Sequence, residues 1–138
     1  MKKTVTVKKC KSHRTVMVIF SVAMFVVLTM CVFAMQTAAA LLFYVPFFVI
    51  WAPMTIYFLT WQIRFEKSGI VRKVFFRESK KYSFAMLREV VKSFYASERN
   101  FTVRMYFVDG KVLQFRMDDE NATQAVKTLL RHGSIKTL

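Results

Sequence analysis

The sequence predicts a membrane α-hairpin of two transmembrane helices joined to a small α+β domain. Three observations lead to this fold class. No charged residue occurs from Thr15 to Ile63, although the chain contains 22 Lys or Arg and 8 Asp or Glu residues. All eight carboxylates lie beyond this run, between Glu66 and Glu120. The C-terminal segment that holds them alternates apolar and polar residues, which is typical of half-buried strands.

The uncharged run, 15–63, is long enough to cross a bilayer twice, because about 20 apolar residues span the hydrocarbon. The pattern predicts helices over about 16–35 and 41–61, with a turn at 36–40. Pro46 and Pro53 predict a kink in the second helix. No glycine precedes Gly69, so we expect the helices to pack through Ser21, Ala23, Ala34 and bulkier side chains.

A basic arm, 1–14, precedes the first helix and has six Lys or Arg and no carboxylate. Its alternating Val5 and Val7 fit a short strand or a disordered arm, and we expect disorder with contacts to lipid headgroups. Cytoplasmic loops beside membrane helices are enriched in Lys and Arg. Because Arg64 follows the second span, we expect a multi-pass protein of the cell (inner) membrane with both termini cytoplasmic.

Cleavage of the first span as a signal peptide is the alternative, because Ala38-Ala39-Ala40 resembles a cleavage site. The apolar segment is longer than the roughly 7–15 residues of the apolar h-region of a signal peptide, and a second span follows it. Cys10 and Cys31 lie in the arm and in the first span, so no disulfide framework is expected.

The C-terminal domain, 64–138, is expected to be antiparallel with one closing helix. Strands are predicted, from the exit of the second span onwards, at 61–66, 70–77, 81–85 and 90–95, with a turn at Ser68-Gly69, a helical turn at 86–89 and a loop at 96–100.

A β-hairpin over 101–117 is the clearest local pattern in the chain. A three-residue connection, 108–110, pairs Met105 with Leu113 and Val103 with Phe115. A two-residue connection at Asp109-Gly110 would break the apolar face. The predicted inward residues are Val103, Met105, Phe107, Leu113 and Phe115.

Asp118 or Asp119 is expected to cap a helix that follows the hairpin. Gly133 is expected to end this helix, and His132 to act as a cation near its C-terminus. Its apolar stripe, spaced i, i+3, i+4, i+7 and i+8, consists of Ala122, Ala125, Val126, Leu129 and Leu130.

The order of these elements, with the segment Tyr82–Val90 and the Asp-Gly hairpin, resembles bacterial pleckstrin-homology-like (PH-like) domains that follow one or two membrane spans. The resemblance covers about 65–131. Phe84, Leu87 and Val90 occupy the family's apolar positions, whereas Ala85-Met86 lacks its usual acid. The resemblance implies a PH-like sheet or partial barrel of about six strands and a cytoplasmic binding or scaffold module without catalysis.

The sequence gives little support for an enzyme, a metal site or a cofactor. His13 and His132 have no Cys or carboxylate at ligand spacing. The cluster Asp118-Asp119-Glu120 fits a metal ion less well than a charged first helical turn. No phosphate-binding glycine loop or nucleophile motif occurs.

Six cations near the start of the domain form the candidate site, and we name them the basic cluster. An anionic inner leaflet attracts such residues. A nucleic acid is the alternative ligand for basic and aromatic residues that interleave, but we expect no nucleic acid, with the aromatics in the core. A regulatory or accessory subunit of a membrane complex, acting through its hairpin, is the alternative function, with a membrane protein as partner. The basic cluster consists of Lys67, Arg72, Lys73, Arg77, Lys80 and Lys81.

Overall fold

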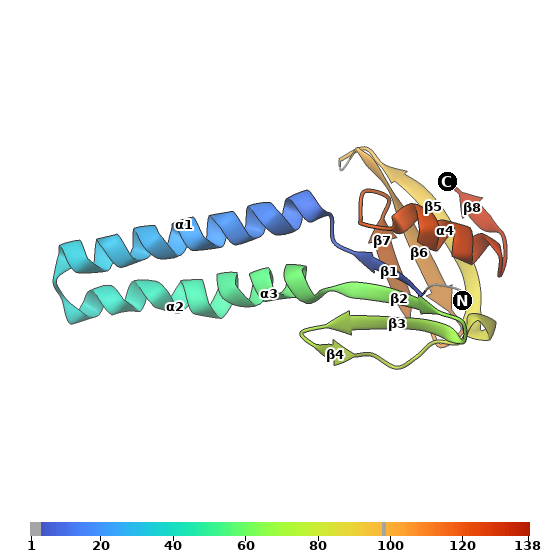
Figure 1. Cartoon of the computed structure of the whole chain (residues 1–138), viewed down its shortest axis with the longest axis horizontal. Helices are drawn as coiled ribbons and strands as arrows, with labels where there is room; N and C mark the ends of the chain where they lie inside the picture. Colours follow the sequence, from blue (N-terminus) through green and yellow to red (C-terminus); the bar gives the residue numbers. More distant parts are fainter. Residues whose placement is uncertain (1–3, 98) are drawn as a thin grey trace. The chain divides into compact units, whose positions relative to one another are not determined.

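The computed structural model describes residues 4–97 and 99–138, which form two compact units (Figure 1). The hairpin unit is Lys11–Thr60. The α+β unit combines Met1–Cys10 with Trp61–Leu138. The coarse prediction of two long apolar helical segments and an α+β fold is therefore confirmed.

The hairpin unit contains two helical segments that are long and apolar enough to cross a membrane. The first, α1, begins in the basic arm and covers Lys11–Met35. The second is continuous but irregular, and a π-helical turn precedes Pro53, whose missing N–H removes a regular helical hydrogen bond. Its parts are η1 (Ala38–Phe43), α2 (Tyr44–Pro46), η2 (Phe47–Trp51) and α3 (Ala52–Thr60).

Polar side chains connect the two helical segments of the hairpin unit. Ser21 Oγ and Thr55 Oγ1 lie 3.0 Å apart, and Trp51 Nε1 donates to Ser21 Oγ at 2.9 Å. Nearer the turn, the Tyr44 hydroxyl donates to Thr29 Oγ1 at 3.0 Å. The expectation that Ser21 packs between the helices is confirmed.

The first sheet of the α+β unit joins strands from both sides of the hairpin. Its order is β1-β2-β3-β4, and all neighbours are antiparallel. Val7 of β1 lies opposite Ile63 of β2, and both side chains are fully buried. The strands are β1 (Val5–Lys8), β2 (Gln62–Glu66), β3 (Gly69–Val74) and β4 (Arg77–Glu78).

The second sheet has the order β7-β6-β5-β8, with β8 parallel to β5 and the other pairs antiparallel. Met105 lies opposite Leu113 and Val103 opposite Phe115, so the predicted hairpin register is confirmed. Gly110 has the left-handed φ of 81° that the three-residue connection requires. The strands are β5 (Leu87–Tyr95), β6 (Asn100–Phe107), β7 (Val112–Arg116) and β8 (Ile135–Thr137).

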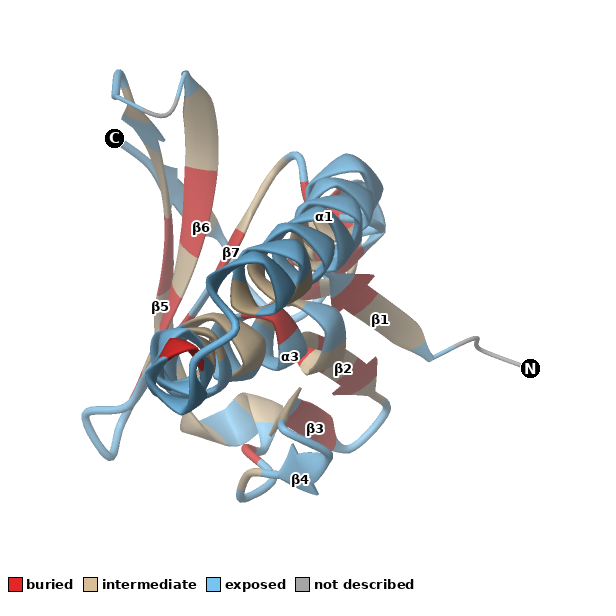
Figure 2. Cartoon of the chain, turned by 90° about the vertical axis from the view of Figure 1, so that its left-hand side faces the viewer, coloured by how far each residue is buried: buried red, intermediate tan, exposed pale blue. Residues whose placement is uncertain are grey.

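The hydrophobic core consists mainly of strand residues, and Figure 2 shows buried stretches along strands of both sheets. All five residues predicted to face inward from the 101–117 hairpin are buried. The helix α4 (Ala122–Leu130) contributes Ala122, Ala125 and Leu129, whereas Val126 is half-buried and Leu130 is exposed. The predicted stripe is therefore correct except at Leu130.

Several sequence predictions are wrong in the α+β unit. Val5–Lys8 is a strand and not part of a disordered arm, because its valines complete the core. The predicted strand 70–77 is interrupted at Phe75-Phe76, where both φ angles are positive. Residues 81–85, all of them described, do not form the predicted strand. Tyr82 forms one isolated bridge, and the helical turn η3 covers Phe84–Met86.

The strand count also differs from the prediction of about six, because the described residues form eight strands. The predicted strands omit β1, where a disordered arm is the preferred expectation, and β8; both pair with distant segments. Gly69 is needed at the start of β3, because a Cβ there would collide with the Tyr82 carbonyl group. Backbone hydrogen bonds between Ile70 and Tyr82, of 2.7 and 2.9 Å, hold the segment after β4 against the first sheet beside this glycine.

Candidate lipid-contact surface

The basic cluster lies in the first sheet and in the segments that connect its strands. Lys67 occupies the β2–β3 turn, Arg72 and Lys73 lie in β3, and Arg77 lies in β4. Lys80 and Lys81 follow β4. All are exposed except Lys73, which is half-buried.

The strand register divides the basic cluster between two faces. Arg72 lies opposite the buried Ile63, whereas Lys73 lies opposite Gln62 and Glu78. Opposed residues share a face of a sheet and consecutive residues do not. The six cations therefore do not form one flat patch, and the sequence could not show this because strand ends and register were unknown.

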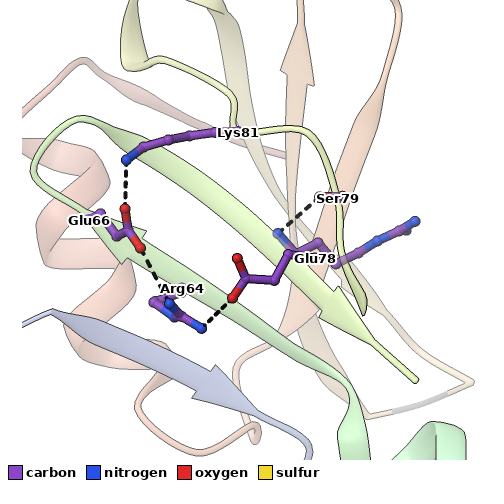
Figure 3. A network of polar contacts seen from close by, with 6 residues as sticks. Arg64, Glu66, Glu78, Ser79 and Lys81 are labelled. Carbon is purple, nitrogen blue, oxygen red and sulfur yellow. Dashed lines mark hydrogen bonds and ion pairs between the residues drawn. The ribbon is translucent and has the colours of Figure 1, made fainter. Parts of the chain in front are cut away.

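Lys81 belongs to an ion-pair network on the first sheet (Figure 3). Its Nζ lies within 2.6 Å of Glu66 Oε2, while Arg64 contacts Glu66 at 3.5 Å and Glu78 at 2.8 Å. The hydrogen bond from Lys81 lowers the pKa of Glu66, and the charge of Arg64 lowers it further. These carboxylates offset part of the positive charge that the basic cluster would present.

Two cations that the sequence analysis left out of the site lie at the end of this sheet where both helices attach. Lys8 pairs with Gln62, close to the junction between α3 and β2. Lys9 Nζ lies 4.1 Å from the centroid of the Trp61 ring, which is a cation–π contact. The order of residues along the chain hid this proximity, because the hairpin unit separates Lys9 from Trp61.

The aromatic residues within the basic cluster are at a turn and not in the core. Val74 pairs with Arg77, so Phe75 and Phe76 alone connect β3 to β4. Their exposed fractions are 46% and 76%. The expectation that the aromatics interleaved with the cations belong to the core is therefore wrong for Phe75 and Phe76 and correct for Tyr82, which is buried.

The acidic cluster Asp118-Asp119-Glu120 is structural. Asp119 is buried, and its carboxylate accepts hydrogen bonds from the backbone N–H groups of Arg116 (2.9 Å) and Cys10 (3.3 Å). Burial raises the pKa of Asp119 although both bonds oppose the shift. Neither Asp118 nor Asp119 caps α4, because Asn121 occupies the N-cap position in a left-handed conformation. The prediction of an aspartate cap is wrong.

No group of three His, Cys, Asp or Glu side chains in the described residues is placed to hold a metal ion. The ring of His132 stacks on Phe84, with centroids 3.8 Å apart and planes 7° apart. His132 follows the C-terminal end of α4, and its N–H donates to the Leu129 carbonyl. The backbone of His132 thus bonds to the last turn of α4, at the helix end where the sequence predicts a cation.

Comparisons with known proteins identify no related family. No family model matches the chain, and neither a curated protein nor a solved structure matches it.

Proposed function

We propose that the protein is a membrane-anchored cytoplasmic binding or scaffold module of PH-like type, as the sequence resemblance implies. The observation that carries the proposal is the pairing of β1 with β2. These strands flank the hairpin unit in the chain, and together they form part of one sheet and one core. The hairpin unit is thus an insertion in the chain between two paired strands of one folded unit.

The exposed apolar surface of the hairpin supports insertion into a bilayer. As a helix of 25 residues, α1 is about 37 Å long, which exceeds the roughly 30 Å of hydrocarbon. All residues of α1 are described, and none of them is buried. Large apolar side chains such as Phe33, with 76% exposed, would contact lipid.

The strand pairing also supports a topology with both hairpin ends on one side. Val7 and Ile63 cannot be neighbours in a sheet if a membrane separates them. Cleavage at Ala38-Ala39-Ala40 would remove β1 from the core, which argues against a signal peptide. The cations beside both ends, including Lys11 and Arg64, favour the cytoplasmic side.

A binding role agrees with the contacts of the two carboxylates whose pKa is shifted. Glu66 is held in ion pairs with Arg64 and Lys81. Asp119 accepts backbone hydrogen bonds that join β1 to the end of β7. Both groups thus serve the fold, which favours a module that presents a surface over one that performs acid–base chemistry.

Cysteine labelling of the full chain tests the proposed topology. In a Cys10→Ser, Cys31→Ala background, a membrane-impermeant maleimide should label Thr37→Cys in intact cells and should not label Lys136→Cys. Both residues are exposed, so accessibility differs only through the membrane. Labelling of Lys136→Cys from outside would exclude the proposed topology.

The second candidate is an accessory or regulatory subunit that acts through the hairpin. A groove of about 300 Å³ between the helices favours it, because an apolar side chain of another membrane helix would fit there. A photoreactive residue at Ile50, which lines the groove, should then give a stoichiometric protein adduct. The same residue at Val49 is the control, since its exposed fraction of 67% matches the 66% of Ile50 and it does not line the groove. Lipid adducts alone at both positions would count against this candidate.

A further inference from the structure

The turn between β3 and β4 has an unusual composition. Two-residue hairpin turns with positive φ at both positions favour Asn-Gly, because most side chains disfavour this conformation. Here Phe75 and Phe76 adopt φ angles of 50° and 63°. Phe76 is 76% exposed, so burial in the core does not account for its presence.

The register places this turn at the end of the first sheet where the helices attach. β2 starts at Gln62, directly after Trp61 and the end of α3 at Thr60. Lys73 lies opposite Gln62, and the chain then passes beyond that level into the Phe75-Phe76 turn. On the other side of β2, Lys8 also lies opposite Gln62, shortly before α1 begins. The turn therefore lies at the sheet end that is tethered to both helices.

Cations flank the aromatic turn on both faces of the sheet. Arg77 pairs with Val74 immediately beside the turn, and Arg72 shares the face of this pair. Lys73 lies on the opposite face. Exposed aromatic residues flanked by Lys or Arg fit the boundary between acyl chains and anionic headgroups, because rings enter the apolar layer while cations stay at the phosphates.

We propose that the Phe75-Phe76 turn inserts into the headgroup boundary of an anionic bilayer, with Arg72, Lys73 and Arg77 contacting phosphate groups. This inference rests on the proposed membrane anchor and adds a second attachment point to it. The turn would enter the same bilayer that contains the hairpin, because only a few residues of chain connect this end of the sheet to the ends of the two helices. The insertion fixes the orientation of the α+β unit relative to the membrane.

The proposal is tested with the full chain in nanodiscs that contain phosphatidylglycerol and phosphatidylcholine. An environment-sensitive nitrobenzoxadiazole label is attached to Phe76→Cys in the Cys10→Ser, Cys31→Ala background. Val108→Cys is the matched control, because Val108 is an apolar residue in the β6–β7 connection with 71% of its surface exposed. Nitroxide lipids should quench the label at position 76 several-fold more strongly than at position 108. Equal quenching at the two positions, or a blue shift at 76 without quenching, would overturn the proposal, the latter indicating burial against protein.

A second variant separates insertion from folding. Phe75→Asn/Phe76→Gly supplies the residues that this turn conformation favours, so its unfolding midpoint should equal or exceed that of the parent protein. Headgroup nitroxides should quench a label on the exposed Lys80→Cys in the parent protein. The same label should be quenched less in the Asn-Gly variant. Unchanged quenching in a folded Asn-Gly variant would show that the phenylalanines do not hold the unit at the membrane.

Lipid composition tests the cations. Replacing phosphatidylglycerol by phosphatidylcholine should reduce quenching at position 76 several-fold, and Lys73→Gln/Arg77→Gln should give the same reduction in anionic nanodiscs. Quenching that is equal in both lipids would overturn the role of the cations. Topology labelling at Thr37→Cys distinguishes failure of this inference from failure of the anchor, because the anchor requires external labelling whatever the turn does.

Discussion

The hairpin unit and the α+β unit distribute polar and apolar side chains in opposite ways. In the α+β unit, Ile63, Met105 and Phe115 are almost fully buried, and among the charged residues that the structure describes only Asp119 is buried. In the hairpin unit, large apolar side chains are exposed, while Thr55 is buried and Ser21 lies between the helices. This difference supports the proposed lipid environment of the hairpin unit, because an apolar surface is stable in lipid and unstable in water.

Charge at a core position of β1 should have one of the largest effects in the α+β unit. Val7→Asp should lower the free energy of unfolding by about 3–5 kcal/mol, because Val7 is fully buried and the new charge has no partner. Thr4→Asp is the exposed control and should change it by less than about 0.5 kcal/mol. Chemical denaturation in detergent measures both. Equal, small effects of the two substitutions would support a disordered arm in place of β1.

Truncation of a phenylalanine should depend strongly on the unit that contains it. Phe115→Ala should cost about 3–5 kcal/mol, as truncations of buried aromatics do. Phe33→Ala in α1 should cost little, because the lipid that replaces the ring is also apolar. Gln114→Ala, next to Phe115 but exposed, should cost less than about 0.5 kcal/mol. A large loss at Gln114 would mean that the inward face of β7 is assigned wrongly.

An arginine should reverse the order of sensitivity between the two units. Val26→Arg lies near the middle of α1 and should cost about 2.5–3.5 kcal/mol in membrane insertion. Gln114→Arg, at an exposed position of β7, should leave stability within about 0.5 kcal/mol. Insertion assays of the full chain and denaturation provide the two measurements. Unimpaired insertion of Val26→Arg would contradict a lipid environment for α1.

The polar contacts between the helices should contribute modestly. Ser21→Ala removes the partner of Thr55 Oγ1 and Trp51 Nε1 and should cost about 0.6 kcal/mol, with an upper limit near 1.7. Cys31→Ala, at an exposed position of α1, is the control and should have no measurable effect. Unfolding in bicelles provides the comparison. A cost as large as that of Phe115→Ala would mean that the hairpin is stabilised like a soluble core.

The smallest expected effect is a pH dependence confined to the α+β unit, with opposite signs at two carboxylates. Burial raises the pKa of Asp119 above 3.8, so the unfolded chain ionises first and stability falls as pH rises through this interval. The Lys81 contact lowers the pKa of Glu66 below 4.5, so its contribution is present above 4.5 and is lost as pH falls. Unfolding free energies from about pH 3 to about pH 7 should show wild type losing stability relative to Asp119→Asn as pH rises, and gaining slightly relative to Glu66→Gln. The same sign at both positions would contradict these environments.

Local patterns allowed the helical segments and the central β-hairpin to be predicted from the sequence. The absence of charge from Thr15 to Ile63 predicts two apolar helices, because an uncharged apolar run of this length is typical of helices that cross a membrane. The register of Met105 with Leu113 follows from alternation and from Gly110 in the connection. Each of these features depends on residues that are near one another in the chain.

Tertiary structure decided the features that depend on distant partners. The alternating valines of Val5–Lys8 fit a short strand or a disordered arm, and pairing with β2 across the whole hairpin unit makes the segment a strand. β8 likewise depends on β5. The sequence predicts Asp119 as a helix cap, whereas in the fold it is buried and accepts a hydrogen bond from the Cys10 backbone. Phe75-Phe76 resembled strand residues because alternation does not show where pairing stops. For β1, β8 and Asp119 the deciding contact joins segments that are distant in the chain, so their proximity exists only in the folded protein, whereas the pairing of Val74 with Arg77 closes the Phe75-Phe76 turn locally.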